Sequence, residues 1–148
     1  MKAPAIFPLA AAQSGVYAAP TDLARLKLSA QGAGLVWFEL DLAGVAAKSE
    51  LLACCQKIFG LPPTFGHNWD ALADSLEDFS WQPARGYVIV LRHGGTFARH
   101  SPQEFVTALE IFTDASTYWA AKHKLFLALL DKDTRGARAL RSLPNISG

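Results

Sequence analysis

The chain has 148 residues, of which 51% are hydrophobic and 18% are charged. This composition excludes a disordered tail, a fibrous repeat and a charged coiled coil, and the length suits one domain with a sizeable core. The formal net charge of +1 hides an uneven distribution. Residues 35–83 hold seven acids and two bases, a net of −5. The preceding segment holds three bases and one acid (+2), and the following segment holds nine bases and five acids (+4). An acidic centre favours a cationic partner over direct binding of nucleic acid.

The two cysteines, Cys54 and Cys55, are adjacent in the sequence. Neighbouring cysteines rarely satisfy disulfide geometry, so we expect both to be reduced and the protein to be cytoplasmic. The opening after Met1-Lys2 is short and contains prolines, which does not fit a secretory signal. No apolar run approaches the length of a membrane span, so we expect no membrane partner.

Short apolar runs in the sequence predict three buried strands. They lie at residues 35–38, 87–91 and 125–130, and continuous apolar runs are typical of strands buried on both faces. Ahead of them, residues 15–17 fit a short edge strand and residues 21–28 fit a small amphipathic helical turn.

Helical signals fill the gaps between these strands. Apolar residues recur at helical spacing in residues 48–59, and Gly60 with two following prolines marks the end. Residues 68–78 form a second helix with Asn68 as its N-cap. A third helix covers residues 102–121, where Ser101 is predicted to cap and Glu104 to close a capping box.

The order strand, helix, helix, strand, helix, strand predicts a small α/β domain. Its three-stranded parallel sheet is packed with helices, because helical crossovers make successive strands parallel. We divide the chain into an appended N-terminal segment (1–34), the α/β domain (35–131) and a flexible C-terminal tail (132–148).

Acidic side chains are most concentrated on the second predicted helix, residues 68–78. Asp70 and Asp74 are four residues apart, so their carboxylates are neighbours on one face, and Glu77 and Asp78 continue that face by another turn. Like charges at this spacing destabilise a helix slightly, although Asp70 in the first turn is favoured by the helix dipole. Two interpretations fit the pattern: a solvated helix face, or a surface for a cationic partner.

The segment LPPTFGHNWDALADSL, residues 61–76, resembles the barstar family of ribonuclease inhibitors. The matching elements are a proline before the loop, then an aromatic residue, Gly66, Asn68, and an Asp-Ala-Leu-x-Asp run from Asp70 to Asp74. The preceding helix, the strand at 87–91, the helix at 102–121 and the last strand follow in the family's order. The resemblance therefore spans about residues 35–130 and implies a barstar-like three-layer fold.

Inhibitors of this family use an acidic helix and the loop before it to cover a ribonuclease active site. The resemblance implies that Asp70 and Asp74 are presented to the enzyme, and that Asp114 adds an acid from the next helix. It also implies partner contacts by the loop and helix residues Thr64, Gly66, His67, Asn68, Ala73 and Glu77. No cofactor is implied, and we expect a monomer in the free state.

Three positions depart from the inhibitors' pattern. Thr64 and Ala73 stand where inhibitors have a tyrosine and a tryptophan, and His67 replaces an acid. Because aromatic anchors often supply interface hot spots, these changes leave two hypotheses open. One is a basic ribonuclease as the target, and the other is a barstar-like binding module for another cationic protein.

An enzyme is a third possibility that the residues raise. His67 with Asp70 and Asp74 could ligate a metal or perform acid–base chemistry, but His67 precedes the helix, so periodicity does not fix its position relative to them. Gly94-Gly95 follows a strand, yet we predict no helix directly after it, so it is no phosphate-binding loop. The sequence therefore favours a binding protein over an enzyme.

Overall fold

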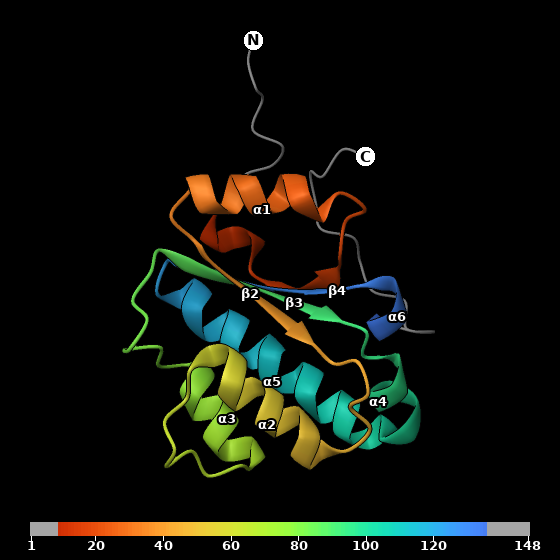
Figure 1. Ribbon diagram of the computed structural model, residues 1–148. Helices are drawn as coiled ribbons and strands as arrows, with labels where there is room; N and C mark the ends of the chain where they lie inside the picture. Colours follow the sequence, from red (N-terminus) through yellow and green to blue (C-terminus); the bar gives the residue numbers. More distant parts are fainter. Residues whose placement is uncertain (1–8, 136–148) are drawn as a thin grey trace.

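The computed structural model describes residues 9–135 (Figure 1). The elements are η1 (Ala11–Gln13), β1 (Gly15–Ala18), α1 (Leu23–Gly32), β2 (Val36–Asp41), α2 (Lys48–Phe59), α3 (Trp69–Leu76), β3 (Gly86–Arg92), α4 (Gly95–His100), α5 (Pro102–Ala121), β4 (Leu125–Leu130) and α6 (Lys132–Arg135). The three predicted strands are confirmed, as are the helices at 48–59 and 102–121, but only β3 and β4 have the predicted burial, since β2 is partly exposed.

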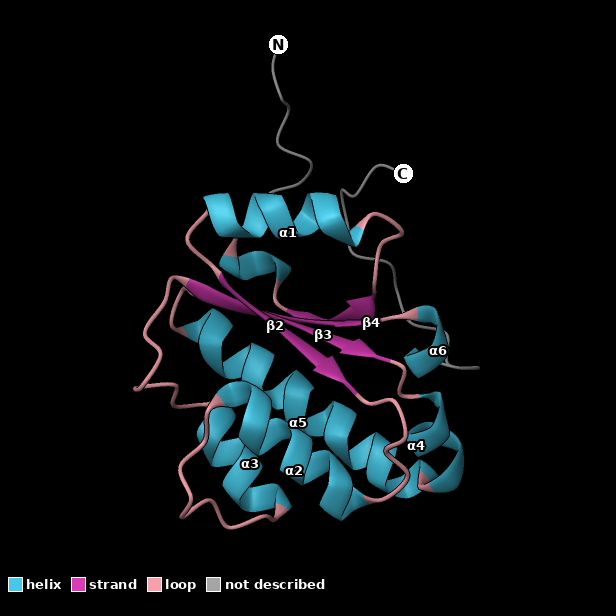
Figure 2. Ribbon diagram, in the orientation of Figure 1, coloured by secondary structure: helices cyan, strands magenta, loops and turns pink. Residues whose placement is uncertain are grey.

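The sheet has four parallel strands in the order β1-β4-β3-β2, so the prediction of three strands was wrong. The additional strand is β1, which confirms the short edge strand predicted at residues 15–17 and pairs with β4 from Gly15 opposite Leu127 to Ala18 opposite Leu130. The hydrophobic pattern of a four-residue edge strand is too short to predict its pairing partner, which lies more than a hundred residues away. The α/β class is correct, and α1 lies on one side of the sheet while α2, α3 and α5 lie on the other (Figure 2).

Crossover handedness explains why α1 lies alone on its side. The chain crosses the sheet from β1 at one edge to β2 at the other, and then returns through β3 to β4. Parallel crossovers are right-handed, so opposite directions of travel place the connecting helices on opposite faces. The helices that follow β2 and β3 therefore share the face away from α1.

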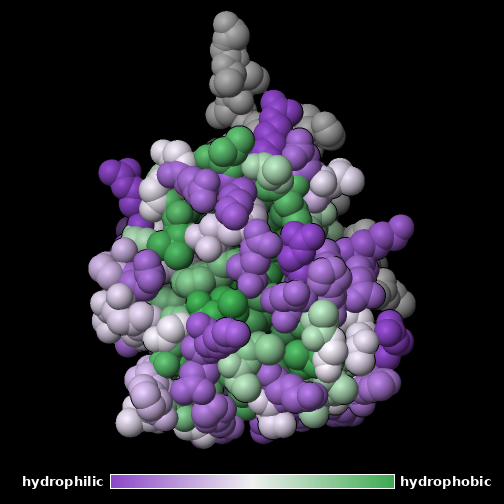
Figure 3. Space-filling view, viewed as in Figure 1, coloured by the Kyte–Doolittle hydropathy of each residue, from purple (hydrophilic) through white to green (hydrophobic). Residues whose placement is uncertain are grey.

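Alternating strand residues supply two hydrophobic cores. Tyr87, Ile89 and Leu91 of β3 point into the larger core with α2, α3 and α5, whereas Val88 and Val90 point toward α1. Every residue of the two central strands except Arg92 is buried, which is why their sequences read as continuous apolar runs. At the open edge, β2 is only partly buried, and hydrophobic side chains gather across the middle of that face (Figure 3).

Two predictions about helix starts were wrong. Ser101 makes no capping hydrogen bond, because its hydroxyl donates to the Ala46 carbonyl at 2.8 Å, and Glu104 Oε2 is buried without a hydrogen-bond partner. A tertiary contact thus replaces the predicted capping box, although the helix does begin at Pro102. The prediction that no helix follows Gly94 was also wrong, since α4 begins at Gly95.

The flanking segments contain ordered elements. The predicted N-terminal segment includes β1 and α1, which pack on β4 and β2, and the predicted tail begins with α6. Thr134 in α6 is fully buried. Residues 1–8 and 136–148 lie outside the described part of the chain. Within the part that the structure describes, no helix is both long and apolar enough to cross a membrane.

Candidate partner-binding surface

The loop between α2 and α3 is held by buried anchors. Gly60 ends α2 in the left-handed conformation (φ 69°), and Leu61 and Phe65 are 7% exposed. The Pro62 carbonyl accepts hydrogen bonds from the Gln56 side chain and from the Phe65 N–H, both at 2.9 Å. The anchored loop leaves the next residues exposed: Pro63, Thr64, Gly66 and His67.

Asn68 joins the loop to α3. Its Oδ1 accepts a 2.7 Å hydrogen bond from the Ala71 N–H, which confirms the predicted N-cap, and its Nδ2 donates to the Gly66 carbonyl at 3.2 Å. His67 has a positive φ of 50° and its ring lies 4.9 Å from that of Phe65. The residues before α3 are therefore set by local bonds, and the loop and helix present one continuous surface.

Helix α3 is strongly amphipathic. Leu72 and Leu76 are fully buried against the larger core, whereas Asp70 and Asp74 are exposed one turn apart. Ala73 is half-buried between them. The helix is shorter than predicted, because Glu77 is already its C-cap residue and the next residues form a turn.

A buried indole connects α3 to α5. Trp119 of α5 donates its Nε1–H to the Leu76 carbonyl at 2.7 Å, so the end of α3 is fixed on the longer helix. This packing brings Asp114 of α5 close to the acids of α3. Burial raises the pKa of Glu77, and the nearby charges of Asp114 and Asp74 raise it further. We call Asp70, Asp74, Glu77 and Asp114 the acidic face.

The acidic face forms no ion pair with any residue that the structure describes. Among residues 9–135 the ion pairs are Lys27–Glu39, Arg92–Glu39 and His93–Asp41, and none includes these four acids. The nearest described cation–aromatic contact belongs to Lys48, whose Nζ lies 5.3 Å from the centre of the Trp69 ring. Unpaired carboxylates that repel one another favour a cation supplied from outside.

The structure places all nine predicted residues on the loop, on α3 or its C-cap, and on α5. It brings Asp74, Glu77 and Asp114 together, and it gives Asn68 a structural task as helix cap. Sequence reasoning missed Lys48 and Trp119 as neighbours of this surface. Neither could have been found from spacing, because both approach α3 from other helices.

A family model described as Barstar (barnase inhibitor) matches residues 35–131, which is more than half of the chain. The chain belongs to the barstar family. No curated protein matches it at the level of a clear relative. The match ends at Asp131 and begins just before β2, so it contains the loop, α3 and α5, and thus the whole acidic face of this barstar-family protein.

The two cysteines and His67 with its neighbouring aspartates bear on the enzyme alternative. Burial raises the pKa of both cysteine thiols, whereas a reactive cysteine needs a lowered pKa. In the described part of the chain, no group of three or more His, Cys, Asp or Glu residues is arranged to hold a metal, so His67 with the two aspartates forms no such group. The barstar family is one of inhibitors rather than enzymes.

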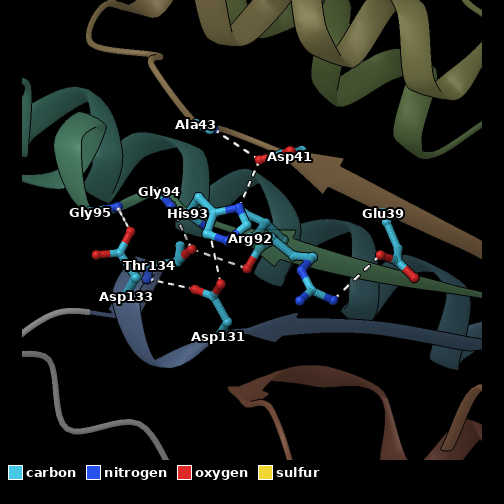
Figure 4. A network of polar contacts seen from close by, with 11 residues as sticks. Glu39, Asp41, Ala43, Arg92, His93, Gly94, Gly95, Asp131, Asp133 and Thr134 are labelled. Atoms are coloured by element: carbon cyan, nitrogen blue, oxygen red, sulfur yellow. Dashed lines mark hydrogen bonds and ion pairs between the residues drawn. The ribbon is translucent and has the colours of Figure 1, made fainter. Parts of the chain in front are cut away.

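A second polar cluster lies where the strands end (Figure 4). Three consecutive backbone N–H groups each donate to a side chain of the 131–134 turn: His93 to Asp131 Oδ2, Gly94 to Thr134 Oγ1 and Gly95 to Asp133 Oδ2, at 2.8–2.9 Å. A Cβ on Gly95 would lie 2.5 Å from Asp133 Oδ1, so a larger residue there would have to displace the carboxylate that accepts from the Gly95 N–H. Because these three N–H groups already donate to side chains of the same protein, they are not left available for a phosphate. The Gly94-Gly95 pair therefore packs β3 and α4 against the 131–134 turn.

Proposed function

We propose that this barstar-family protein is a stoichiometric inhibitor of a basic ribonuclease. The carrying observation is the convergence of Asp74, Glu77 and Asp114 from α3 and α5 without any basic partner in the described residues. A ribonuclease active site is lined with cations that hold phosphate, and closely spaced carboxylates can occupy the same place. The loop from Thr64 to Asn68 lies beside these acids in sequence and covers the rim of the target.

Recognition in this scheme has two stages. Complementary fields speed the encounter, and charge pairs that lose their water on docking set the rate of dissociation. No cofactor takes part. The free thiols of Cys54 and Cys55 fit a reducing compartment, so we place the inhibition in the cytoplasm.

The test is a titration against basic microbial ribonucleases, with RNA cleavage as the readout. We expect cleavage to stop at one equivalent of the protein. Asp74→Ala should weaken inhibition by about 2–5 kcal/mol, because it leaves a cation of the enzyme buried and unpaired. The control is Gln31→Lys, which changes the net charge by the same amount at an exposed position of α1. Equal loss in both variants, or no inhibition of any ribonuclease, contradicts the proposal.

A second candidate is a binding module for another cationic protein. It is favoured by Thr64 and Ala73, which stand where inhibitors of the family carry aromatic residues. Without these anchors the same acidic face binds a basic surface that need not be an active site. Co-purification with the wild type and with Asp74→Ala separates the two candidates. A partner that is lost in the variant and is not a nuclease supports the binding module.

A further inference from the structure

Two adjoining hollows run along the exposed side of α5. One has a volume of about 240 Å³ and is lined by Val106, Leu109, Glu110, Thr113 and Asp114. The other, of about 470 Å³, is lined by Pro102, Gln103, Val106, Thr107 and Glu110. They share Val106 and Glu110, so we treat them as one feature, the α5 groove. It meets the acidic face at Asp114, which belongs to both.

The α5 groove combines an apolar floor with an acidic rim. Val106 and Leu109 are half-buried, and their remaining surface faces the groove. The hydroxyls of Thr107 and Thr113 donate to helix carbonyls one turn earlier, at 3.2 and 2.8 Å. The carboxylates of Glu110 and Asp114 are thus the charged groups of the groove, and no described ion pair neutralises them.

The charge pattern selects the occupant. Glu110 and Asp114 are four residues apart and exposed on the same face of α5, so they repel each other. Helix α5 has three acids and no lysine or arginine over its 20 residues. A cation placed between the two carboxylates removes that repulsion. Arginine fits better than lysine, because its planar guanidinium can bond both carboxylates while its methylene stem lies on the apolar floor.

The shape of the groove also fits a side chain better than a metabolite. Pockets for drug-sized ligands are deep and enclose roughly 300–1,000 Å³. The hollow of about 240 Å³ lies below that range and the one of about 470 Å³ lies within it, but the described residues that line both belong to a single helix, α5. A groove that follows one helix can hold the side chains of a segment that lies along that helix.

We propose that the α5 groove binds an arginine-bearing, aliphatic-flanked segment of the same basic partner, and that this contact takes the place of the aromatic anchors absent at Thr64 and Ala73. The inference rests on the proposed function for the identity of the partner. It extends the binding surface beyond the acidic face, toward the N-terminal half of α5. Val106 and Glu110 become its specificity-determining residues.

The test maps a peptide on the full chain by NMR and needs no nuclease. The probe is acetyl-Leu-Arg-Ala-Arg-amide at low salt, and the control peptide carries citrulline in place of each arginine, which keeps the shape and removes the charge. We expect saturable amide shifts centred on residues 102–114 for the arginine peptide only. Glu110→Gln should weaken that binding about fivefold or more, the effect of one charge-assisted hydrogen bond.

The matched control is again Gln31→Lys, which has the same net charge as Glu110→Gln but lies on the other side of the sheet. Equal weakening by both variants would overturn the proposal, since the peptide would then sense only the overall charge. Shifts confined to residues 70–77, or no saturation below about 10 mM, would overturn it as well. If no ribonuclease is inhibited but the peptide maps to α5, the proposed function fails and the groove assignment stands.

Discussion

His93 is the residue at which the ends of β2, β3 and β4 are tied together. It has a positive φ of 58°, its Nδ1 lies 2.9 Å from Asp41 Oδ1, and its N–H donates to Asp131. The hydrogen bond to Asp41 raises the pKa of His93 above its ordinary value of 6.5 and lowers that of Asp41 below 3.8. Asp131 also helps to raise the pKa of His93, while Arg92 and the partial loss of water act against it.

These shifts predict a pH window for stability. Because the pKa of His93 is raised on folding, its contribution is complete below pH 6.5 and is lost as the pH rises through the folded value. The lowered pKa of Asp41 makes its contribution complete above pH 3.8 and lost at lower pH. We expect the Tm of the wild type to fall more between pH 6 and pH 8.5 than that of His93→Asn, in which asparagine tolerates the positive φ.

Thermal melts of both proteins across this range measure the effect. The two proteins differ only at position 93, so the difference between the two curves isolates the contribution of His93. Parallel curves would show that the pair contributes nothing to folding.

The relation between α3 and α5 is the decisive feature at the scale of elements. Helix α3 has only eight residues, too few to be stable alone, so its place depends on packing. Leu72 and Leu76 bury one side, and the indole of Trp119 binds the carbonyl at its C-terminal end. Since Asp74 and Asp114 lie on these two helices, the same hydrogen bond sets the spacing of the acidic face.

Trp119→Phe tests this coupling. The change leaves the buried Leu76 carbonyl without its indole donor, and we expect a loss of about 1–3 kcal/mol in the free energy of unfolding, measured by urea titration. Binding of the basic partner should weaken as well, because the carboxylates are no longer held at one spacing. Tyr118→Phe is the matched control, since Tyr118 is half-buried beside Trp119 and the change removes only a hydroxyl. Equal stability of the two variants would contradict the coupling.

At the scale of the whole molecule, the distribution of charge matters more than its sum. The net charge is +1, yet α3 and α5 carry five acids (Asp70, Asp74, Glu104, Glu110 and Asp114) and no lysine or arginine. Twelve of the 14 bases lie in the segments before and after the acidic centre, residues 35–83. A cationic partner that approaches the side of α3 and α5 therefore meets a negative field despite the near-neutral total.

Steering by that field predicts a strong dependence of association on salt. We expect the association rate with a basic ribonuclease to fall about tenfold or more between about 50 mM and about 500 mM salt, because the Debye length shrinks below the distance over which the charges act. Stopped-flow fluorescence measures the rate, and the dissociation rate should change much less. A rate that does not respond to salt would mean that these acids are a solvated face with no part in recognition.

Much of the fold could be predicted because its signals are local. Continuous apolar runs marked β2, β3 and β4, helical spacing with Gly60 and Asn68 marked the limits of α2 and α3, and the motif from Gly66 to Asp74 indicated the family. Each of these signals depends on neighbours in the chain, which share one backbone conformation. The sequence by itself therefore determined the class of the fold, the parallel strands and the acids that line the exposed side of α3.

Only the tertiary structure decided how distant segments meet. The pairing of β1 with β4 joins residues 112 apart, as the bond from the Phe126 N–H to Ser14 Oγ shows, and a four-residue strand gives no sign of it. Ser101 binds the Ala46 carbonyl instead of capping its own helix. The approach of Asp114 to Glu77 goes with a bond between their two helices, in which the Trp119 indole of α5 donates to the Leu76 carbonyl of α3. The physical reason is common to all three: contacts between distant residues depend on what the fold leaves within reach.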